Sequence, residues 1–228
     1  MSDLLKFSAG TLQEVALGFM ALVYITRIIW FLGFKAGGER QPQTGIVTPN
    51  GEHQTSRAKG AMYSLANIAM PWAMESTRNK PLFYAQFVIF HLGVVFAIGL
   101  SFIIPYAAWL LEYKALVIIS QVMIGAAFLV GVGRMIRRVT NPYIRAISSP
   151  DDYFSLALLT VWFFFGVLAA PNDTTGGEWH LLAFFLLTAF FLIYVPFSKI
   201  SHYLYYPFTR YYFGKSMGYR GVYPIQRG

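Results

Sequence analysis

The sequence contains no cysteine among its 228 residues. The chain therefore forms no disulfides, and it supplies no thiolate ligands to an iron–sulfur cluster or to a cysteine-based zinc site. Any chemistry that depends on such groups has to come from another protein.

Charged side chains are also scarce, because only 12% of the residues are charged and 56% are hydrophobic, with a mean hydropathy of +0.50. This composition excludes an ordinary soluble domain and indicates an integral membrane protein. The net charge of +8 does not indicate nucleic acid as a partner, since the basic residues lie in short segments beside apolar runs. Membrane lipid is the expected surrounding.

Long apolar runs predict five transmembrane helices, at residues 12–34, 83–104, 115–133, 153–169 and 179–202. Each run has at least the roughly 17 residues that a membrane-crossing helix needs. Helices satisfy their own backbone groups in lipid, so the predicted fold is an all-α bundle of five transmembrane helices. We expect one membrane domain over residues 1–228, with a loop at 35–82 and a tail at 203–228.

The distribution of basic residues predicts the orientation of this bundle. Most Lys and Arg side chains lie in the loop 35–82, in the segment after the third span and in the tail 203–228. By the positive-inside rule these segments are cytoplasmic, which places the N-terminus outside and the C-terminus in the cytoplasm. Within the loop, residues 61–74 have apolar side chains at helical spacing and predict a short helix on the membrane or under a partner.

Two of the four histidines occupy matching depths under this orientation. His91 lies early in the second span and His202 late in the fifth, so both lie near the cytoplasmic surface. Histidine is costly inside a membrane, and neutral imidazole is a good ligand of haem iron. The pair predicts one haem b held between the two spans. The alternative is two unrelated polar anchors, and His53, in a polar loop, is expected to be solvated.

Haem with histidine on both axial positions cannot bind a substrate at iron, so the expected role is transfer of single electrons. The chain has no C-x-x-C-H motif, so the haem would be bound without a covalent link. Four cationic residues on the same side of the membrane could pair with the haem propionates: Arg137, Arg138, Arg145 and Lys199. The same cluster would arise if these charges only set the orientation.

Three segments of the chain resemble the membrane cytochrome b (gamma) subunit of respiratory nitrate reductase: FHLG at 90–93, RRVTNPYIRA at 137–146 with the following Asp152, and PFSKISH at 196–202. Members of that family have five transmembrane helices, and the nitrate-reducing members hold two b haems between the second and the fifth. The resemblance implies that His91 and His202 bind the cytoplasm-side haem. It also implies a multi-pass protein of the cytoplasmic (inner) membrane of a prokaryote.

Two departures from the family pattern bear on the number of haems. Ser101 stands ten positions after His91, and Phe184 stands eighteen positions before His202, where the family has its other two histidines. The resemblance therefore implies one haem b and a closer likeness to the b subunits of sulfate-reducer and sulfur-oxidiser membrane complexes, such as the sulfite-reductase-linked and high-molecular-weight cytochrome c complexes. Expected partners are a cytoplasmic iron–sulfur subunit similar to heterodisulfide reductase, other membrane subunits and a periplasmic cytochrome c.

His180, one turn before Phe184, is a candidate contact for menaquinone. Its imidazole could hydrogen-bond a quinone carbonyl and exchange a proton with it, with room near Ser101 and Phe184. The alternative is that phenylalanine side chains fill that room. A structural anchor or a transporter subunit without haem also stays open, although an anchor does not explain the matched histidines and a transporter would need repeats that the chain lacks.

Overall fold

The computed structural model of the protein describes residues 2–34, 41–72 and 75–225, so the predicted loop 35–82 and tail 203–228 lie partly outside the described residues. In the described ranges every element is a helix, apart from one isolated bridge between Val47 and His53. Five helical segments are long and apolar enough to cross a membrane: Asp3–Leu32, Pro81–Tyr106, Lys114–Thr140, Pro150–Ala169 and Trp179–Phe197. The predicted all-α fold with five spans is confirmed.

The chain divides into two compact units, Met1–Arg27 with Ala85–Ile200 and Ile28–Tyr84 with Ser201–Gly228. The first unit holds most of the apolar helices. The second unit combines two segments that flank residues 85–200 in the sequence. Each unit is described by itself below. A single domain over residues 1–228 stays a prediction.

The core of the first unit is built from aromatic side chains of two helices. Its helices are α1 (Asp3–Ala9), α2 (Thr11–Leu32, which continues into the second unit), α5 (Pro81–Tyr106), α6 (Lys114–Thr140), α7 (Pro142–Ala146), α8 (Pro150–Ala169) and α9 (Trp179–Tyr194). Trp162 of α8 is fully buried, stacks on Phe184 of α9 and donates its indole N–H to Thr188 Oγ1 at 2.8 Å. The indole donor of the buried Trp162 is therefore paired.

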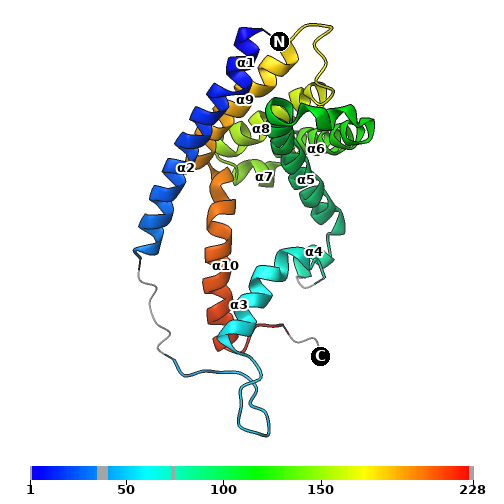
Figure 1. Ribbon diagram of the computed structural model, residues 1–228. Helices are drawn as coiled ribbons and strands as arrows, with labels where there is room; N and C mark the ends of the chain where they lie inside the picture. The colour runs from blue at the N-terminus through cyan, green and yellow to red at the C-terminus, as the bar shows by residue number, and fades with distance from the viewer. Residues whose placement is uncertain (1, 35–40, 73–74, 226–228) are drawn as a thin grey trace. The chain divides into compact units, whose positions relative to one another are not determined.

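Helix α1 precedes the N-terminal end of α2, and in Figure 1 it runs beside α9. Leu5 and Ala9 of α1 are buried, and Gln13 at the start of α2 donates to the Phe185 carbonyl oxygen at 2.7 Å. Residues at the start of the chain thus pack against the fifth apolar helix. The observed first candidate span is accordingly longer than the predicted 12–34.

The second unit contains a close helix pair, α3 (Arg57–Ala66) and α10 (His202–Tyr219), with short helices η1 (Asn67–Ala69) and α4 (Glu75–Arg78). The hydroxyl of Ser56 caps α3 by accepting the Lys59 N–H at 3.2 Å. Arg210 of α10 donates to the Ser64 carbonyl oxygen at 3.1 Å. The short helix predicted at 61–74 therefore begins and ends earlier, and one of its faces lies on α10.

The fifth apolar run is interrupted where the sequence predicts one helix over 179–202. Helix α9 ends at Tyr194, and the 3₁₀ turns η3 (Val195–Phe197) and η4 (Lys199–Ser201) follow before α10 begins at His202. Pro196 lacks the N–H that a continuing α-helix uses, and Ser198 adopts an extended backbone with φ −104° and ψ 170°. His202 is therefore the first residue of a new helix and not the last residue of the fifth span.

Candidate functional site

His91 is exposed on α5, and one nitrogen of its ring is hydrogen-bonded to the backbone. Its Nδ1 lies 2.7 Å from the carbonyl oxygen of Phe87, one helical turn earlier. A carbonyl oxygen only accepts hydrogen bonds, so Nδ1 carries the proton and Nε2 carries the lone pair. Metal-binding histidines commonly have this arrangement, with the second nitrogen donating to a backbone carbonyl. Nε2 is therefore the candidate ligand atom of His91.

The helix around His91 is fixed by close packing on both sides of the residue. A Cβ atom at Gly93 would lie 2.1 Å from the Ala127 Cβ, so α5 and α6 approach each other as only glycine permits. The guanidinium of Arg134 lies 4.9 Å from the centroid of the Phe90 ring. These two contacts pack the residues of α5 that flank His91 against α6.

His202 is exposed at the first position of α10, directly after the buried Ser201. Its ring lies 6.5 Å from that of Tyr203. His91 belongs to the first compact unit and His202 to the second. Pairing of the two imidazoles across one haem therefore stays a prediction.

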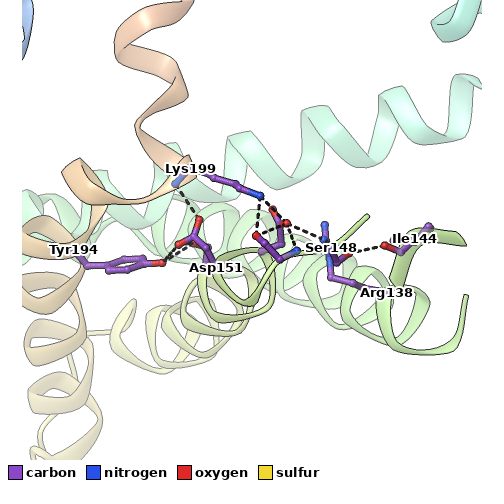
Figure 2. Close-up of polar contacts among 9 residues, drawn as sticks. Arg138, Ile144, Ser148, Asp151, Tyr194 and Lys199 are labelled. Carbon is purple, nitrogen blue, oxygen red and sulfur yellow. Dashed lines mark hydrogen bonds and ion pairs between the residues drawn. The ribbon is translucent and has the colours of Figure 1, made fainter. Parts of the chain in front are cut away.

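A network of polar side chains surrounds the first turn of α8 (Figure 2). Asp152 Oδ2 accepts the backbone N–H of Ser149 at 2.8 Å, which is the Asp152 half of a capping box. The same oxygen also accepts the Ser149 hydroxyl at 2.8 Å. The Lys199 ammonium lies 2.8 Å from the same carboxylate oxygen and 2.8 Å from Ser149 Oγ. Lys199 therefore connects the turn after α9 to the start of α8.

Asp151, the neighbouring carboxylate, contacts the chain on both sides of the α9–α10 break (Figure 2). Its Oδ2 accepts the backbone N–H of Lys199 at 3.1 Å, and its Oδ1 accepts the hydroxyl hydrogen bond of Tyr194. The Tyr194 hydroxyl also lies 3.0 Å from Ser155 Oγ. One aspartate thus joins the last residue of α9 and the first residue of η4 to α8.

Arg138 belongs to the same network. It donates to Ser148 Oγ at 2.7 Å and lies 3.8 Å from Asp152 Oδ2, with 27% of the arginine side chain exposed. Arg138 and Lys199 thus share one carboxylate, so both have a protein partner that holds them in place. Their predicted contact with haem propionates is not tested by this arrangement.

The other two predicted propionate contacts, Arg137 and Arg145, are exposed. Arg137 lies near the end of α6, and Arg145 lies on α7, whose start is capped by Asn141 Oδ1 through the N–H groups of Tyr143 and Ile144. The sequence T-N-P-Y therefore marks a helix start that turns the chain from α6 toward α8. Binding of a propionate by either arginine stays a prediction.

The N-terminal end of α9 has the features that bear on His180. His180 is half-buried in the first turn of α9, with its ring 5.6 Å from that of Trp179. Phe184 is fully buried in the aromatic core, and the Ser101 hydroxyl donates to the Ile98 carbonyl oxygen at 2.7 Å. Phe184 therefore packs in the core, which agrees with the alternative that phenylalanine side chains fill the room near His180. A menaquinone contact at His180 stays a prediction.

The turn before α9 carries an aspartate with a local role. Asp173 accepts the Thr175 N–H at 2.8 Å and the Thr175 hydroxyl at 3.0 Å, and these hydrogen bonds lower the pKa of Asp173 below its ordinary value. In the described part of the chain, no group of three or more His, Cys, Asp or Glu side chains could hold a metal ion. The candidate ligands for a metal centre are therefore individual histidines.

With this geometry described, the relatives of the sequence decide the family. Residues 58–185 match the nitrate reductase gamma subunit family. The chain belongs to this family. A protein of Nitratidesulfovibrio vulgaris is 27% identical over 183 residues, which cover 78% of this chain and 77% of that protein. No solved structure matches the sequence.

Membership of the nitrate reductase gamma subunit family supports a membrane cytochrome b subunit that transfers electrons within a redox complex. The matched range includes His91, and it ends before Lys199 and His202. The family match therefore does not reach the PFSKISH segment, and the resemblance of that segment to the gamma subunit family depends on the seven residues of the segment alone. The predicted family is confirmed, and the five candidate spans support a multi-pass membrane protein.

Several residues of the site have roles that the sequence did not predict. The Phe87 carbonyl, Asp151 and Tyr194 all act through hydrogen bonds to distant or backbone atoms. A sequence signal existed for Asp152, because Ser149-x-x-Asp152 before an apolar run is a capping-box pattern. No comparable local pattern marks Asp151 or Tyr194, whose partners are about 40 residues apart in the chain.

Proposed function

We propose that this chain is the b-type cytochrome subunit of a respiratory redox complex, and that it relays electrons between the membrane and a cytoplasmic iron–sulfur subunit. His91 and His202 would hold one haem b, with Arg137, Arg138, Arg145 and Lys199 near its propionates. When bound, a haem with two imidazole ligands supplies one-electron transfer. The observation that carries the proposal is the hydrogen bond from His91 Nδ1 to the Phe87 carbonyl, within the range matched by the family.

Two histidine ligands explain why such a site would relay electrons and not bind a substrate. The Phe87 carbonyl lies 2.7 Å from His91 Nδ1, so Nε2 would be the atom of His91 that binds the haem iron. His202 would supply the second imidazole. A metal whose axial positions are both filled by protein has no place for substrate. The chain is therefore an electron-transfer subunit whose catalytic partners are other proteins.

The distribution of charge supports a membrane orientation with the N-terminus outside and the C-terminus in the cytoplasm of a prokaryotic inner membrane. Lys6 and Lys114 are the basic side chains on the proposed outer side, and the remaining basic residues lie on the proposed cytoplasmic side. In this orientation His91 and His202 are near the cytoplasm. The proposed partner is an iron–sulfur protein similar to heterodisulfide reductase, because the chain has no cysteine with which to hold such a cluster itself.

The first expected result is the haem content of the purified protein. One matched histidine pair predicts one non-covalent haem b per chain, since Ser101 and Phe184 offer no imidazole for a second. A pyridine haemochrome assay against protein mass should give a ratio near one. A ratio near two would show that His180 is a haem ligand, and a ratio near zero, with no low-spin absorption spectrum, would favour a haem-free anchor.

The second expected result concerns the cytoplasmic partner. If that partner docks on the loop 35–82, the turn 137–145 and the tail, then Arg145→Glu should reduce its retention during purification from native membranes, because a contact cation becomes an anion. The loss should increase with added salt, since the remaining attraction is screened.

Lys114→Glu is the matched control, because Lys114 is also exposed but lies at the opposite end of α6. It should leave partner retention unchanged. Equal retention in both variants would contradict docking through the turn. Full retention of haem and stability by the chain purified alone from its native membrane would contradict the proposed partner itself.

A further inference from the structure

We propose that Arg134 is a cofactor-binding residue, whose guanidinium pairs with one propionate carboxylate of a haem held by His91. This inference rests on the proposed function, in which His91 is a haem ligand. It adds a residue that lies outside the four predicted propionate contacts. Every contact on which it depends lies within the first compact unit.

Arg134 is an arginine inside an apolar helix. It lies in the last third of α6, within a segment long and apolar enough to cross a membrane, and the residue is half-buried. A charged side chain in such a segment is costly unless it has a partner that compensates for the lost water. The contacts of Arg134 therefore matter more than those of an arginine at the surface.

In the part of the chain that the structure describes, the guanidinium of Arg134 makes no hydrogen bond and no ion pair. Its contact is with an aromatic ring, because it lies over the ring of Phe90 at 4.9 Å from the centroid. An aromatic face attracts a cation but offers no oxygen to accept from the guanidinium N–H groups. Arg134 is thus placed for an anion that the described residues do not supply.

Two of the predicted propionate contacts differ from Arg134 in this respect. Arg138, one turn later on α6, donates to Ser148 Oγ at 2.7 Å and lies 3.8 Å from Asp152 Oδ2. Lys199 lies 2.8 Å from the same carboxylate oxygen. A propionate at Arg138 or Lys199 would compete with Asp152 for its cation. A propionate at Arg134 displaces no carboxylate of the described chain, so Arg134 is the better partner.

Phe90 is the common neighbour of Arg134 and His91. Its ring is buried, with its centroid 6.3 Å from that of the His91 ring, and it packs edge to face on Phe163 of α8. The Arg134 guanidinium and the His91 ring are therefore no farther apart than the sum of their two distances to the Phe90 ring. The cation is a close neighbour of the proposed iron ligand.

Close helix packing places Arg134 beside this part of α5. A Cβ atom at Gly93 of α5 would meet the side chain of Ala127 on α6, and one at Gly131 would lie 2.5 Å from Thr160 Oγ1 on α8. Glycine thus permits a close approach of α6 to both neighbouring helices. These contacts bring the turn of α6 that carries Arg134 beside the turn of α5 that carries Phe90 and His91.

The test compares haem b with its dimethyl ester, in which both propionates are blocked and uncharged. Haem is removed from the purified full-length protein, and each form is bound back to the wild type and to Arg134→Gln. We expect Arg134→Gln to lower the affinity for haem b by about ten- to hundredfold, because a hydrogen bond between two charged groups is lost. The affinity for the ester should change by about twofold or less, because the ester already lacks the carboxylate that Arg134 binds.

The midpoint potential gives a second measurement. Arg134→Gln should lower it, because a nearby cation favours the reduced haem, which carries one positive charge fewer. Arg134→Lys keeps the charge but loses the planar pair of donors, so it should retain most of the potential and lose part of the affinity for haem b alone. This variant replaces Arg134→Gln in the comparison of the two haem forms if Arg134→Gln does not insert into the membrane.

Arg27→Gln is the matched control, because Arg27 also lies in a candidate span and its guanidinium is 5.4 Å from the centroid of a phenylalanine ring, that of Phe197. Arg27 differs in having an acceptor, since it donates to the Pro196 carbonyl oxygen. Arg27→Gln should change the affinities for haem b and for the ester by the same factor. It should leave the midpoint potential unchanged.

The outcomes separate the inference from the function on which it rests. If the wild type binds haem b, but the Arg134 variants bind haem b and the ester with equal losses or with none, Arg134 touches no propionate and the proposed function stands. Loss of a bound anionic phospholipid from Arg134→Gln in that case would assign the arginine to a lipid phosphate. A selective loss in Arg27→Gln as large as that in Arg134→Gln would also overturn the inference. If the wild type binds no haem, the proposed function and the inference both fail.

Discussion

Replacing His91 or His202 with alanine should abolish the low-spin haem spectrum of the purified protein. Each variant leaves the proposed haem with one axial ligand, and low-spin bis-imidazole iron requires two. His91 is prepared for this role by its bond to the Phe87 carbonyl at 2.7 Å, which sets the tautomer that binds through Nε2. Optical and electron paramagnetic resonance spectra of the variants, compared at equal protein concentration, measure the effect.

Two other histidines serve as controls for this experiment. His53 bridges with Val47 in the loop of the second unit, and His180 lies in the first turn of α9. Alanine at either position should leave the low-spin signal in place. A normal spectrum in His91→Ala would contradict the ligand assignment, as would loss of the spectrum in His53→Ala while the protein still folds and inserts.

The five spans could be predicted from the sequence because lipid imposes a simple requirement on every crossing segment. A helix in hydrocarbon must be long and apolar, and hydropathy records both properties. The same measure misses the break after Tyr194, because Val195, Pro196 and Phe197 continue the apolar run while the backbone passes from an α-helix into a 3₁₀ turn. Hydropathy reports the surroundings of side chains and says little about backbone path.

The site could be predicted only in part, for a similar reason. His91 stands out in the sequence as a polar residue in an apolar helix, but its tautomer depends on a carbonyl that every residue possesses. Lys199 and Arg138 were expected to face haem propionates on charge alone. The structure gives both of them Asp152, which is 47 residues from Lys199, and the sequence carries no local signal for such a pair.

Replacing Gly214 with leucine should separate α3 from α10 and destabilise the second unit. A Cβ atom at Gly214 would lie 2.5 Å from the Gly60 carbonyl oxygen and 2.8 Å from the Ala61 Cα, which are backbone atoms that cannot rotate away. Overpacking a tight contact costs about 1–3 kcal/mol and at times more, and we expect about 3 kcal/mol or more here because the backbones themselves must part. The thermal unfolding midpoint and trypsin cleavage at Arg57 and Lys59 measure the effect.

Gly133→Leu is the matched control, since Gly133 is also helical and a Cβ atom there would meet nothing within 4 Å. It should leave the unfolding midpoint and the cleavage pattern unchanged, because leucine is a better helix former than glycine and the position is exposed. The comparison isolates the α3–α10 contact from the general effect of adding a large side chain to a membrane protein. Because α10 begins at His202, loss of α3 packing should also lower haem retention in Gly214→Leu. Equal midpoints and equal cleavage in the two variants would show that the glycines do not bring α3 and α10 into backbone contact.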